Sequence, residues 1–319
     1  MDVKDLLLQG LLSSQKYIDI SFRYDSQGSV YDQECADLEE FYHYRSEKAV
    51  IRSNVKNVVS HLDIPLKVFE LGCGNTKKSQ LILNEILQHQ SHLDYSPNDF
   101  SKDFLVDVCQ NLCTIYGHQL RLTPMPGDLM DALAKIKNYR DRKLILWLSG
   151  LQCFTMVKQF EMLSSIASVL EANDACLLTV DVTQSRELIE KAYLDYDYSK
   201  PNAKLYTNGV HVINRELGGN INLSQFKLEG RYVEDKDVSK ASYNQVWLTS
   251  LCKQSYHLEK VGKTVTFEEG EKLLLYAGNG MSHKYTQKQL DHLFARARLR
   301  IMKKWENEHC ALILCKRIF

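Results

Sequence analysis

The sequence predicts an α/β fold with a mostly parallel central sheet and a second, α+β part. Helix-like and strand-like segments alternate between about residues 47 and 183. This rhythm breaks between residues 184 and 284, after which one helix and two apolar strands close the chain. Strands that alternate with helices pair in parallel through right-handed crossovers, whereas two strands joined by a short turn pair antiparallel.

The elements of the alternating region are identified by their hydrophobic pattern. Each expected helix carries apolar residues three or four positions apart, and each expected strand contains a short apolar run. The helices are expected at residues 47–62, 77–89, 102–117 and 158–172, and the strands at 67–71, 92–99, 143–148 and 176–182.

The end of the chain predicts a helix at 286–297 and an antiparallel hairpin of strands 299–305 and 310–318. A parallel sheet with an antiparallel last strand resembles the class I methyltransferases and their Rossmann-like sheet. Residues 184–284 are rich in Tyr and Asn, and their pattern predicts irregular segments.

Composition narrows the class of protein. Forty basic residues balance forty acidic ones among 319, without a basic run long enough to follow a nucleic acid backbone. The first residues lack the apolar core of a signal peptide, and no apolar run reaches the roughly 18 residues of a membrane span. We expect a cytoplasmic protein, monomeric or weakly homo-oligomeric, that binds neither nucleic acid nor membrane.

The nine cysteines include no CxxC pair, and their odd number does not suit a disulfide framework. His89 and His92 are better explained as solvated residues at a helix end than as metal ligands. We therefore expect no metal site.

A glycine turn follows the first expected strand. In "ELGCG", Glu70 precedes Gly72 and Gly74, and Thr76 is a candidate cap for the next helix. Glycine lets the backbone approach a ligand closely, and a helix N-terminus offers N–H groups to an anion. A dinucleotide fingerprint needs a third glycine where Lys77 stands, and Walker A spacing is absent. The turn suits S-adenosylmethionine, although an ordinary strand-to-helix turn is the alternative.

Two further acids are candidates for this cofactor. Asp99, after the second strand, is placed to hold the ribose hydroxyls, with Asp94 as the competing choice. Asp128 follows the third strand and is placed near the adenine. Each is alternatively a helix-capping or solvated carboxylate.

Several ordered motifs resemble one family, the histidine-specific methyltransferases of the ergothioneine pathway. "YDSQGS" and "EFYHYRSE" resemble the family's Y-D-x-x-G-S and E-Y-Y-x-x-R-x-E, and "ELGCGNTKKS" resembles E-L-G-S-G-T-x-x-K-T. The motifs "YSPNDFSKDFL", "AY", "INREL", "FEEGE" and "SHKY" follow in the same order. The resemblance covers about residues 22–318.

The resemblance implies a two-part enzyme that transfers methyl groups from S-adenosylmethionine to the α-amino nitrogen of histidine. Its parts would be a methyltransferase domain and a substrate domain, at residues 46–183 with 285–319 and at 1–45 with 184–284. The residues expected at the cofactor are Glu70, Gly72, Gly74, Lys78, Asp99 and Asp128, and those expected at the substrate are Tyr24, Tyr193 and Ser282.

Three substrate positions depart from the family pattern. Phe41 replaces the first Tyr of E-Y-Y, Phe154 replaces an Asn that holds the amino-acid end of histidine, and Gly280 replaces a Glu that grips the imidazole. Leaving a buried polar group without its partner costs about 1–3 kcal/mol, so a pocket without these groups disfavours free histidine by roughly tenfold or more. We expect room for a larger ring at Gly280, with Phe154 stacked on it.

The expected acceptor is therefore an aromatic amine or a modified aromatic amino acid, methylated on nitrogen. Replacement contacts are expected from Gln152, Tyr44, His283 and Asn279, with ordinary loop polarity as the alternative for each. Tyr24 and Tyr193 are the candidate catalytic residues, which orient the amine or accept its proton through water; core packing is the competing explanation.

Other functions remain open. One is an S-adenosylmethionine-binding regulatory protein without turnover, and another is a histidine or thiohistidine methyltransferase with rearranged substrate contacts. A dinucleotide-dependent oxidoreductase is disfavoured by Lys77.

Overall fold

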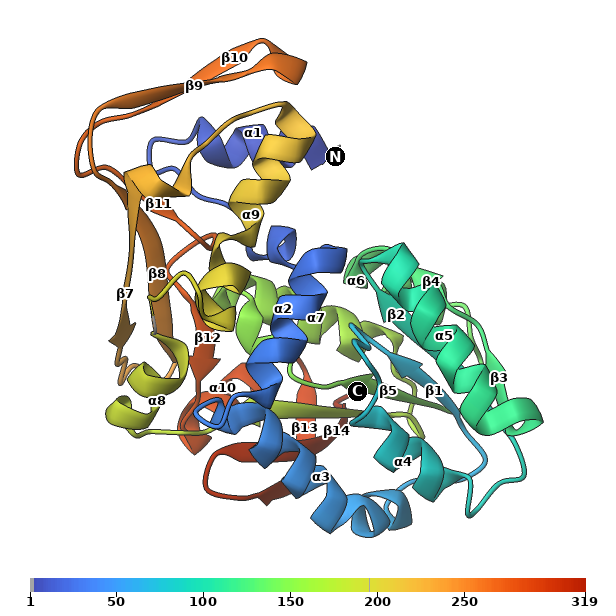
Figure 1. Cartoon of the computed structure of the whole chain (residues 1–319). Coiled ribbons are helices and arrows are strands. Elements are labelled where there is room, and N and C mark those ends of the chain that lie inside the picture. Colours follow the sequence, from blue (N-terminus) through green and yellow to red (C-terminus); the bar gives the residue numbers. More distant parts are fainter. Residues whose placement is uncertain (1–2, 195) are drawn as a thin grey trace. The chain divides into compact units, whose positions relative to one another are not determined.

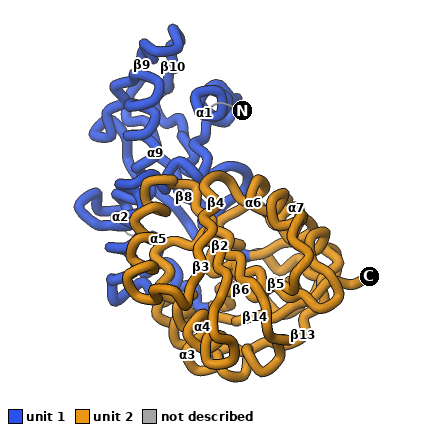
Figure 2. The backbone as a smooth tube through the Cα atoms, turned by 90° about the vertical axis from the view of Figure 1, so that its right-hand side faces the viewer, with its two compact units in different colours: residues 1–41, 184–234, 242–283 blue, residues 42–183, 235–241, 284–319 orange. Residues whose placement is uncertain are grey.

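The computed structural model describes residues 3–194 and 196–319. The chain divides into two compact units (Figures 1 and 2). Unit 1 comprises residues 1–41, 184–234 and 242–283, and unit 2 comprises residues 42–183, 235–241 and 284–319.

An eight-stranded sheet forms the centre of unit 2. Its strand order is β13-β14-β6-β5-β1-β2-β3, and β4 also pairs with β2. Strands β1 to β6 pair in parallel, whereas β14 is antiparallel to both β6 and β13. The strands are β1 (Lys67–Glu70), β2 (Leu93–Asp99), β3 (Leu120–Leu122), β4 (Met125–Pro126), β5 (Lys143–Trp147), β6 (Ala175–Asp181), β13 (Leu299–Glu306) and β14 (Cys310–Arg317).

Helices cover both faces of this sheet, because its central strands are apolar on both sides. Alternate strand residues enter two separate cores, as Leu144 and Leu146 on one face and Ile145 and Trp147 on the other illustrate. The first face is covered by α3 (Tyr42–Ser60), α4 (Ser79–Ile86) and α5 (Lys102–Tyr116), and the second by α6 (Leu129–Ile136), α7 (Met156–Val169) and α10 (Gln287–Arg296).

Unit 1 contains helices and two antiparallel sheets. In the larger sheet β8 lies between β11 and β12 and also pairs with β7, while β9 and β10 form a separate ribbon. The helices are α1 (Val3–Leu11), α2 (Ser26–Asp37), α8 (Arg186–Tyr193) and α9 (Pro201–Leu217). The strands are β7 (Phe226–Val233), β8 (Ser242–Ser250), β9 (Gln254–Leu258), β10 (Lys263–Phe267), β11 (Lys272–Leu274) and β12 (Met281–Lys284).

The predicted fold class is confirmed, including the final antiparallel hairpin. The prediction of irregular segments after residue 184 is wrong, because α9 and the four strands of the larger sheet lie there. Helix α9 begins at Pro201, which is favourable in a first turn, but Gly209 and three Asn residues weaken its helical pattern. A Cβ at Gly209 would lie 2.8 Å from Ile18, so glycine permits close packing there.

The two units differ from the expected division of the sequence at three places. Residues 42–45, residues 235–241 and Lys284, which the prediction groups with the substrate part, fall in unit 2. The short segment 235–241 is attached to α10, where the Gln289 amide donates to the backbone oxygens of Asp235 and Asp237. The functional assignment of the two parts remains a prediction.

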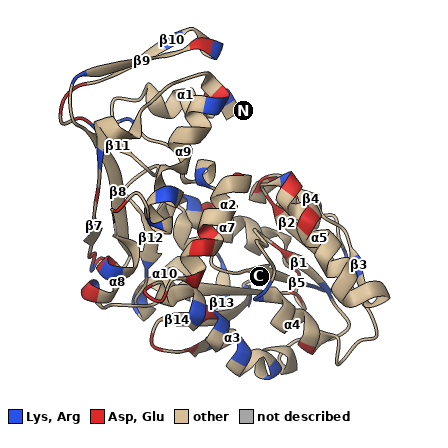
Figure 3. Cartoon of the chain, viewed as in Figure 1, with Lys and Arg blue, Asp and Glu red and all other residues tan. Residues whose placement is uncertain are grey.

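Charged residues of both signs are interspersed over both units (Figure 3). Within the described residues, no helix is long and apolar enough to cross a membrane. The same residues contain no cluster of three or more His, Cys, Asp or Glu side chains suited to a metal ion.

Candidate active site

The glycine turn between β1 and α4 is open on one side. Gly72 and Gly74 have φ angles of +64° and +50°, a region that favours glycine. A Cβ at either position would meet nothing within 4 Å. The turn is fixed from behind, because Gly74 N–H donates to Asp99 Oδ2 at 3.2 Å and Gly72 N–H donates to Asn98 Oδ1 at 3.4 Å. A ligand can therefore approach the backbone closely at this turn.

Asp99 ends β2 beside this turn. Burial raises its pKa, although the N–H groups of Ser101 and Gly74 donate to the carboxylate and act in the opposite direction. The competing acid, Asp94, lies earlier in β2 and pairs with Arg121 and Lys67 at 2.7 and 3.4 Å. Asp99 is thus the acid at the carboxyl edge of the sheet, where open α/β sheets bind their ligands.

Glu70 ends β1 and lies beneath the turn. Its side chain is only 2% exposed, and the Tyr95 hydroxyl donates to it. Burial raises the pKa of Glu70 to about 7, against the effect of this hydrogen bond. The carboxyl group is therefore buried and bound to the neighbouring strand β2.

Lys78 takes part in a buried polar cluster at the same edge. Its ammonium group lies 2.6 Å from Glu47 Oε2 and donates to Ser149 Oγ. Glu47 also accepts hydrogen bonds from the Ser149 and Thr179 hydroxyls. Burial alone would raise the pKa of Glu47, but attraction to Lys78 and His43 and the hydrogen bonds from Lys78 and Ser149 lower it. Lys78 therefore links the start of α4 to α3, with only 15% of its side chain exposed.

Two capping predictions have different outcomes. The predicted Thr76 cap is wrong: Lys78 is the N-cap of α4 and makes no side-chain cap bond, while the Thr76 hydroxyl donates to Asn75 O. Asp128 does cap a helix, since its Oδ1 accepts from Asp131 N–H at 2.9 Å. Asp128 is exposed, so its capping role does not prevent a ligand contact.

Five of the predicted catalytic and substrate residues lie in unit 1. Tyr24 ends the short helix η1 (Ile20–Arg23), and Tyr193 ends α8. The Phe41 ring meets the Tyr193 ring edge-on at 5.1 Å. Tyr193 is 6% exposed, and its backbone oxygen accepts a hydrogen bond from Tyr206 at 2.7 Å. The structure thus brings Phe41 and Tyr193 together, although they are far apart in sequence.

The space expected beside Gly280 is filled. A Cβ at Gly280 would lie 2.2 Å from the Tyr243 ring and 2.7 Å from the backbone oxygen of Asn244. The expectation that glycine leaves room there for a larger ring is therefore wrong. Ser282 follows in β12 with a φ of +49°, an unusual conformation for a residue with a side chain.

Phe154 also differs from its expected role, because its ring lies 6.2 Å from that of buried Trp147 and packs against the core. The prediction that Phe154 stacks on the acceptor ring has no support from this geometry. The other expected replacement contacts have partners of their own. The Tyr44 ring lies under Lys78, the Asn279 backbone oxygen accepts from Gln245, and the His283 ring lies 5.8 Å from Tyr243.

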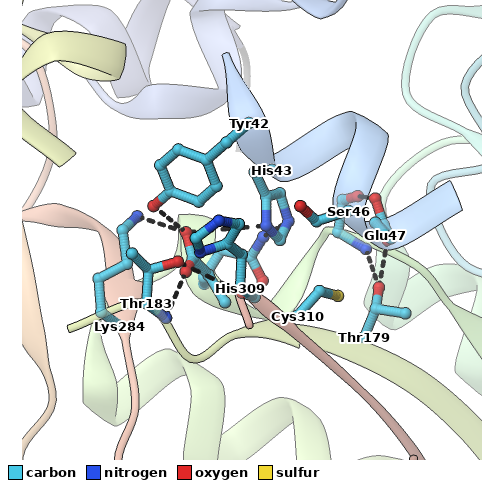
Figure 4. Close-up of polar contacts among 12 residues, drawn as sticks. Tyr42, His43, Ser46, Glu47, Thr179, Thr183, Lys284, His309 and Cys310 are labelled. Atoms are coloured by element: carbon cyan, nitrogen blue, oxygen red, sulfur yellow. Dashed lines mark hydrogen bonds and ion pairs between the residues drawn. The ribbon is translucent and has the colours of Figure 1, made fainter. Parts of the chain in front are cut away.

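A second buried cluster was not predicted. The Asp181 carboxylate, at the end of β6, accepts from Tyr42 Oη at 2.8 Å, Lys284 Nζ at 3.0 Å and Thr183 N–H at 2.9 Å (Figure 4). His43 Nδ1 lies 3.7 Å from the same carboxylate. Attraction to Lys284 and His43 lowers the pKa of Asp181 despite its complete burial, which acts in the opposite direction. Tyr42 and Lys284 stand in recognised motifs, but nothing local in the sequence indicates that they meet at Asp181.

A parallel sheet with an antiparallel end, an open glycine turn and an acid at the end of the neighbouring strand define an α/β methyltransferase. The chain belongs to the family of histidine-specific, S-adenosylmethionine-dependent methyltransferases, whose model matches residues 3–317. It is accordingly an S-adenosylmethionine-dependent N-methyltransferase.

Its relatives are distant in sequence. A histidine N-alpha-methyltransferase from Mycobacterium tuberculosis is 24% identical over 94% of this chain and 89% of its own length. One from Mycolicibacterium smegmatis is 23% identical over 83% and 80% of the two chains. The N-methyltransferase imqF of Aspergillus flavus is 21% identical over 97% and 82%.

Proposed function

We propose that the chain methylates the amino nitrogen of a small aromatic amine or a modified aromatic amino acid, and that free histidine is a poor acceptor. One observation carries the proposal. Phe41, Phe154 and Gly280 stand where the family pattern has three polar side chains, and the surroundings of all three are now known. Phe41 contacts Tyr193, Phe154 contacts Trp147, and Tyr243 covers Gly280.

The cofactor contacts are part of the same proposal. The open turn of Gly72 and Gly74 suits the amino-acid end of S-adenosylmethionine, and Asp99 suits its ribose hydroxyls. Asp128 would lie near the adenine. Lys78, held by Glu47, and buried Glu70 would act mainly by shaping the turn.

Methyl transfer needs a neutral amine that is well oriented. When bound, the cofactor supplies the methyl group on a positively charged sulfur. The lone pair of the amine forms the new N–C bond as the S–C bond breaks, and the nitrogen then loses a proton to water. Alignment of the two reactants in a dry site contributes several kcal/mol to catalysis. We propose that Tyr24, Tyr193 and Ser282 contact the acceptor and orient this nitrogen.

Calorimetry and a turnover screen test the proposal together. Titration with S-adenosylmethionine measures cofactor binding, and a panel of aromatic amines, aromatic amino acids, histidine and thiohistidine is then assayed for methylated products by mass spectrometry. We expect turnover of an aromatic amine or amino acid at a kcat/KM at least tenfold above that of histidine. Preference for histidine or thiohistidine would support rearranged contacts instead. Cofactor binding without any product would support a regulatory protein.

Substitution Tyr193→Phe tests the placement of the acceptor. We expect kcat/KM for the amine to fall about tenfold, because one hydrogen bond to the reacting group is lost, while cofactor affinity stays unchanged. Tyr256→Phe is the matched control, since this tyrosine lies on β9 and donates to Gln254. Wild-type kinetics in Tyr193→Phe would show that Tyr193 does not serve the acceptor.

A further inference from the structure

The last two strands of unit 2 bring together basic residues from two separate parts of the sequence. Residues 296–305 and 309–319 contain seven Lys and Arg and no Asp or Glu. Strand β13 is one edge of the large sheet, and it pairs antiparallel with β14. The positive charges of the two segments therefore lie side by side.

Like charges face each other in this pairing. Arg300 lies opposite Lys316, and exposed Lys303 follows an irregularity in β13. Arg298 precedes β13 with a φ of +57°, and its backbone oxygen accepts a hydrogen bond from Ile318 N–H at 2.8 Å. Like charges directly opposite each other destabilise an antiparallel pair. We call Arg298, Arg300, Lys303 and Lys316 the basic cluster.

The charge of the basic cluster is not compensated within the described part of the chain. None of its four residues forms an ion pair in residues 3–194 and 196–319. Glu306, which follows in β13, lies 2.6 Å from Lys304, and Glu308 is in the turn of the hairpin. A free binding surface of positive charge is thus available to an external anion.

Apolar side chains are exposed next to the same cations. Phe319 and Ile318 are 78% and 46% exposed, and Met302, in the irregular part of β13, is 39% exposed. The Arg317 guanidinium lies 5.0 Å from the centroid of the Phe319 ring. Figure 2 shows this end of the chain at the periphery of unit 2. Exposed apolar groups that lie together mark an interaction surface.

Protection of the sheet edge explains only part of this pattern. Basic residues on an edge strand hinder pairing with other chains, and an irregularity in the strand has the same effect. Exposed Ile318 and Phe319 act in the opposite direction, because apolar groups promote association. A partner that contacts both the cations and the apolar side chains accounts for the whole pattern.

We propose that the basic cluster, together with Met302, Ile318 and Phe319, binds the surface of a membrane that contains anionic lipids. The phosphate and carboxylate groups of these lipids neutralise the cations, and the apolar side chains enter the boundary between headgroups and acyl chains. The methylene stems of Lys and Arg suit the same boundary. A nucleic acid backbone would satisfy the cations but leave Ile318 and Phe319 in water.

The sequence alone does not indicate this surface. Its composition predicts no membrane partner, because the chain contains neither a long apolar run nor a long basic run. The residues concerned meet only when β13 pairs with β14. Attachment of this kind needs no spanning helix, and within residues 3–194 and 196–319 no helix is long and apolar enough to span. It is also independent of which amine is methylated.

Sedimentation of the full chain with vesicles is the first test. Vesicles of phosphatidylcholine alone are compared with vesicles that contain about 30% phosphatidylserine. We expect a partition coefficient at least tenfold higher for the anionic vesicles, because each Lys or Arg near an anionic surface strengthens binding several-fold. The coefficient should fall as the salt concentration rises. Equal binding to both kinds of vesicle, or binding to neither, would overturn the proposal.

The double variant Arg300→Gln, Lys316→Gln removes two charges of the basic cluster. Its partition coefficient on anionic vesicles should fall at least tenfold. Its thermal unfolding midpoint should stay the same or rise, because like charges no longer face each other. Lys135→Gln, Lys137→Gln is the matched control, since both lysines are exposed at the end of α6, which follows β4 near the other edge of the sheet. An equal loss in the control would show that only net charge matters and would contradict the assignment.

Phe319→Ser tests the apolar part of the surface at constant charge. We expect a roughly fivefold lower partition coefficient on anionic vesicles and an unchanged affinity for S-adenosylmethionine by calorimetry. Leu251→Ser is the matched control, because Leu251 is 52% exposed in unit 1, between β8 and β9. Binding that needs the cations but not Phe319 would indicate a soluble polyanion as the partner and would overturn the assignment to a membrane.

Discussion

Asp181 and Glu70 occupy equivalent places but have opposite electrostatic behaviour. Each ends a parallel strand of the same sheet, and the two side chains are 0% and 2% exposed. The pKa of Asp181 is lowered, whereas that of Glu70 is raised to about 7. The difference is the partner: Lys284 lies 3.0 Å from Asp181, while the neutral Tyr95 hydroxyl contacts Glu70. Burial alone therefore does not decide whether a carboxyl at this edge is charged.

Of the substitutions that test this comparison, Asp181→Asn should lower the free energy of unfolding most. It leaves the fully buried Lys284 without its counter-charge, which costs about 3–5 kcal/mol. Urea unfolding followed by circular dichroism measures the loss, and the double variant Asp181→Asn, Lys284→Met should recover most of it. If the free energy of unfolding of Asp181→Asn stayed within about 1 kcal/mol of the wild-type value, the Asp181–Lys284 ion pair would not stabilise this edge of the sheet.

Substitution Glu70→Gln should change the pH dependence of stability. Because the pKa of Glu70 is raised, the folded protein keeps a proton between about 4.5 and 7 that the unfolded chain loses. Stability then falls as pH rises through this window, by roughly 3 kcal/mol for the shift at about 1.36 kcal/mol per pKa unit. Glutamine removes this loss, so the variant should gain stability over wild type at pH 8 but not at pH 4. Parallel unfolding curves at both pH values check the sign.

Asp181 contributes in the opposite direction. Its folded pKa lies below the ordinary value of 3.8, so its stabilisation is present above that value and is lost as pH falls through the folded pKa. The two carboxyl groups thus give the stability two separate pH dependences. Asp181 lowers stability at low pH, and Glu70 lowers it as the pH rises between about 4.5 and 7.

Substitution Tyr42→Phe should have the smallest effect. It removes one hydrogen bond of 2.8 Å to Asp181 but leaves the Lys284 ion pair in place, so we expect a loss of about 1–2 kcal/mol. The same unfolding assay measures it. A loss as large as that of Asp181→Asn would mean that the hydroxyl, rather than the ammonium group, keeps the carboxylate charged.

Local patterns predicted much of unit 2. Strand–turn–helix periodicity and the glycines at 72 and 74 depend on neighbours in sequence, so most strands of the sheet and the turn were placed correctly along the chain, and Asp99 does end the second strand. The short strands β3 and β4 and helix α6 were not predicted. Helix α9 was missed because its packing, including Ile18 against Gly209, outweighs a weak local propensity.

The surroundings of the expected substrate residues depend on contacts between residues that are distant in sequence. Whether Phe154 faces the core is decided by Trp147 and Gly150, and the space at Gly280 is decided by Tyr243 on a neighbouring strand. The Asp181 cluster joins residues 42, 181 and 284, and no spacing in the sequence indicates such a meeting. Motifs therefore located these positions but not the directions of their side chains.

The Asp181 cluster also marks the two positions at which the segment inserted into unit 2 could be exchanged. Apart from residues 235–241, the chain between Thr183 and Lys284 belongs to unit 1, and the carboxylate of Asp181 binds both of these residues. Because Thr183 and Lys284 are held by the same carboxylate, most of unit 1 is topologically an insertion between these two residues of unit 2. A different insert could therefore be joined at Thr183 and Lys284 with short linkers, provided that it supplies a replacement for the segment that Gln289 binds.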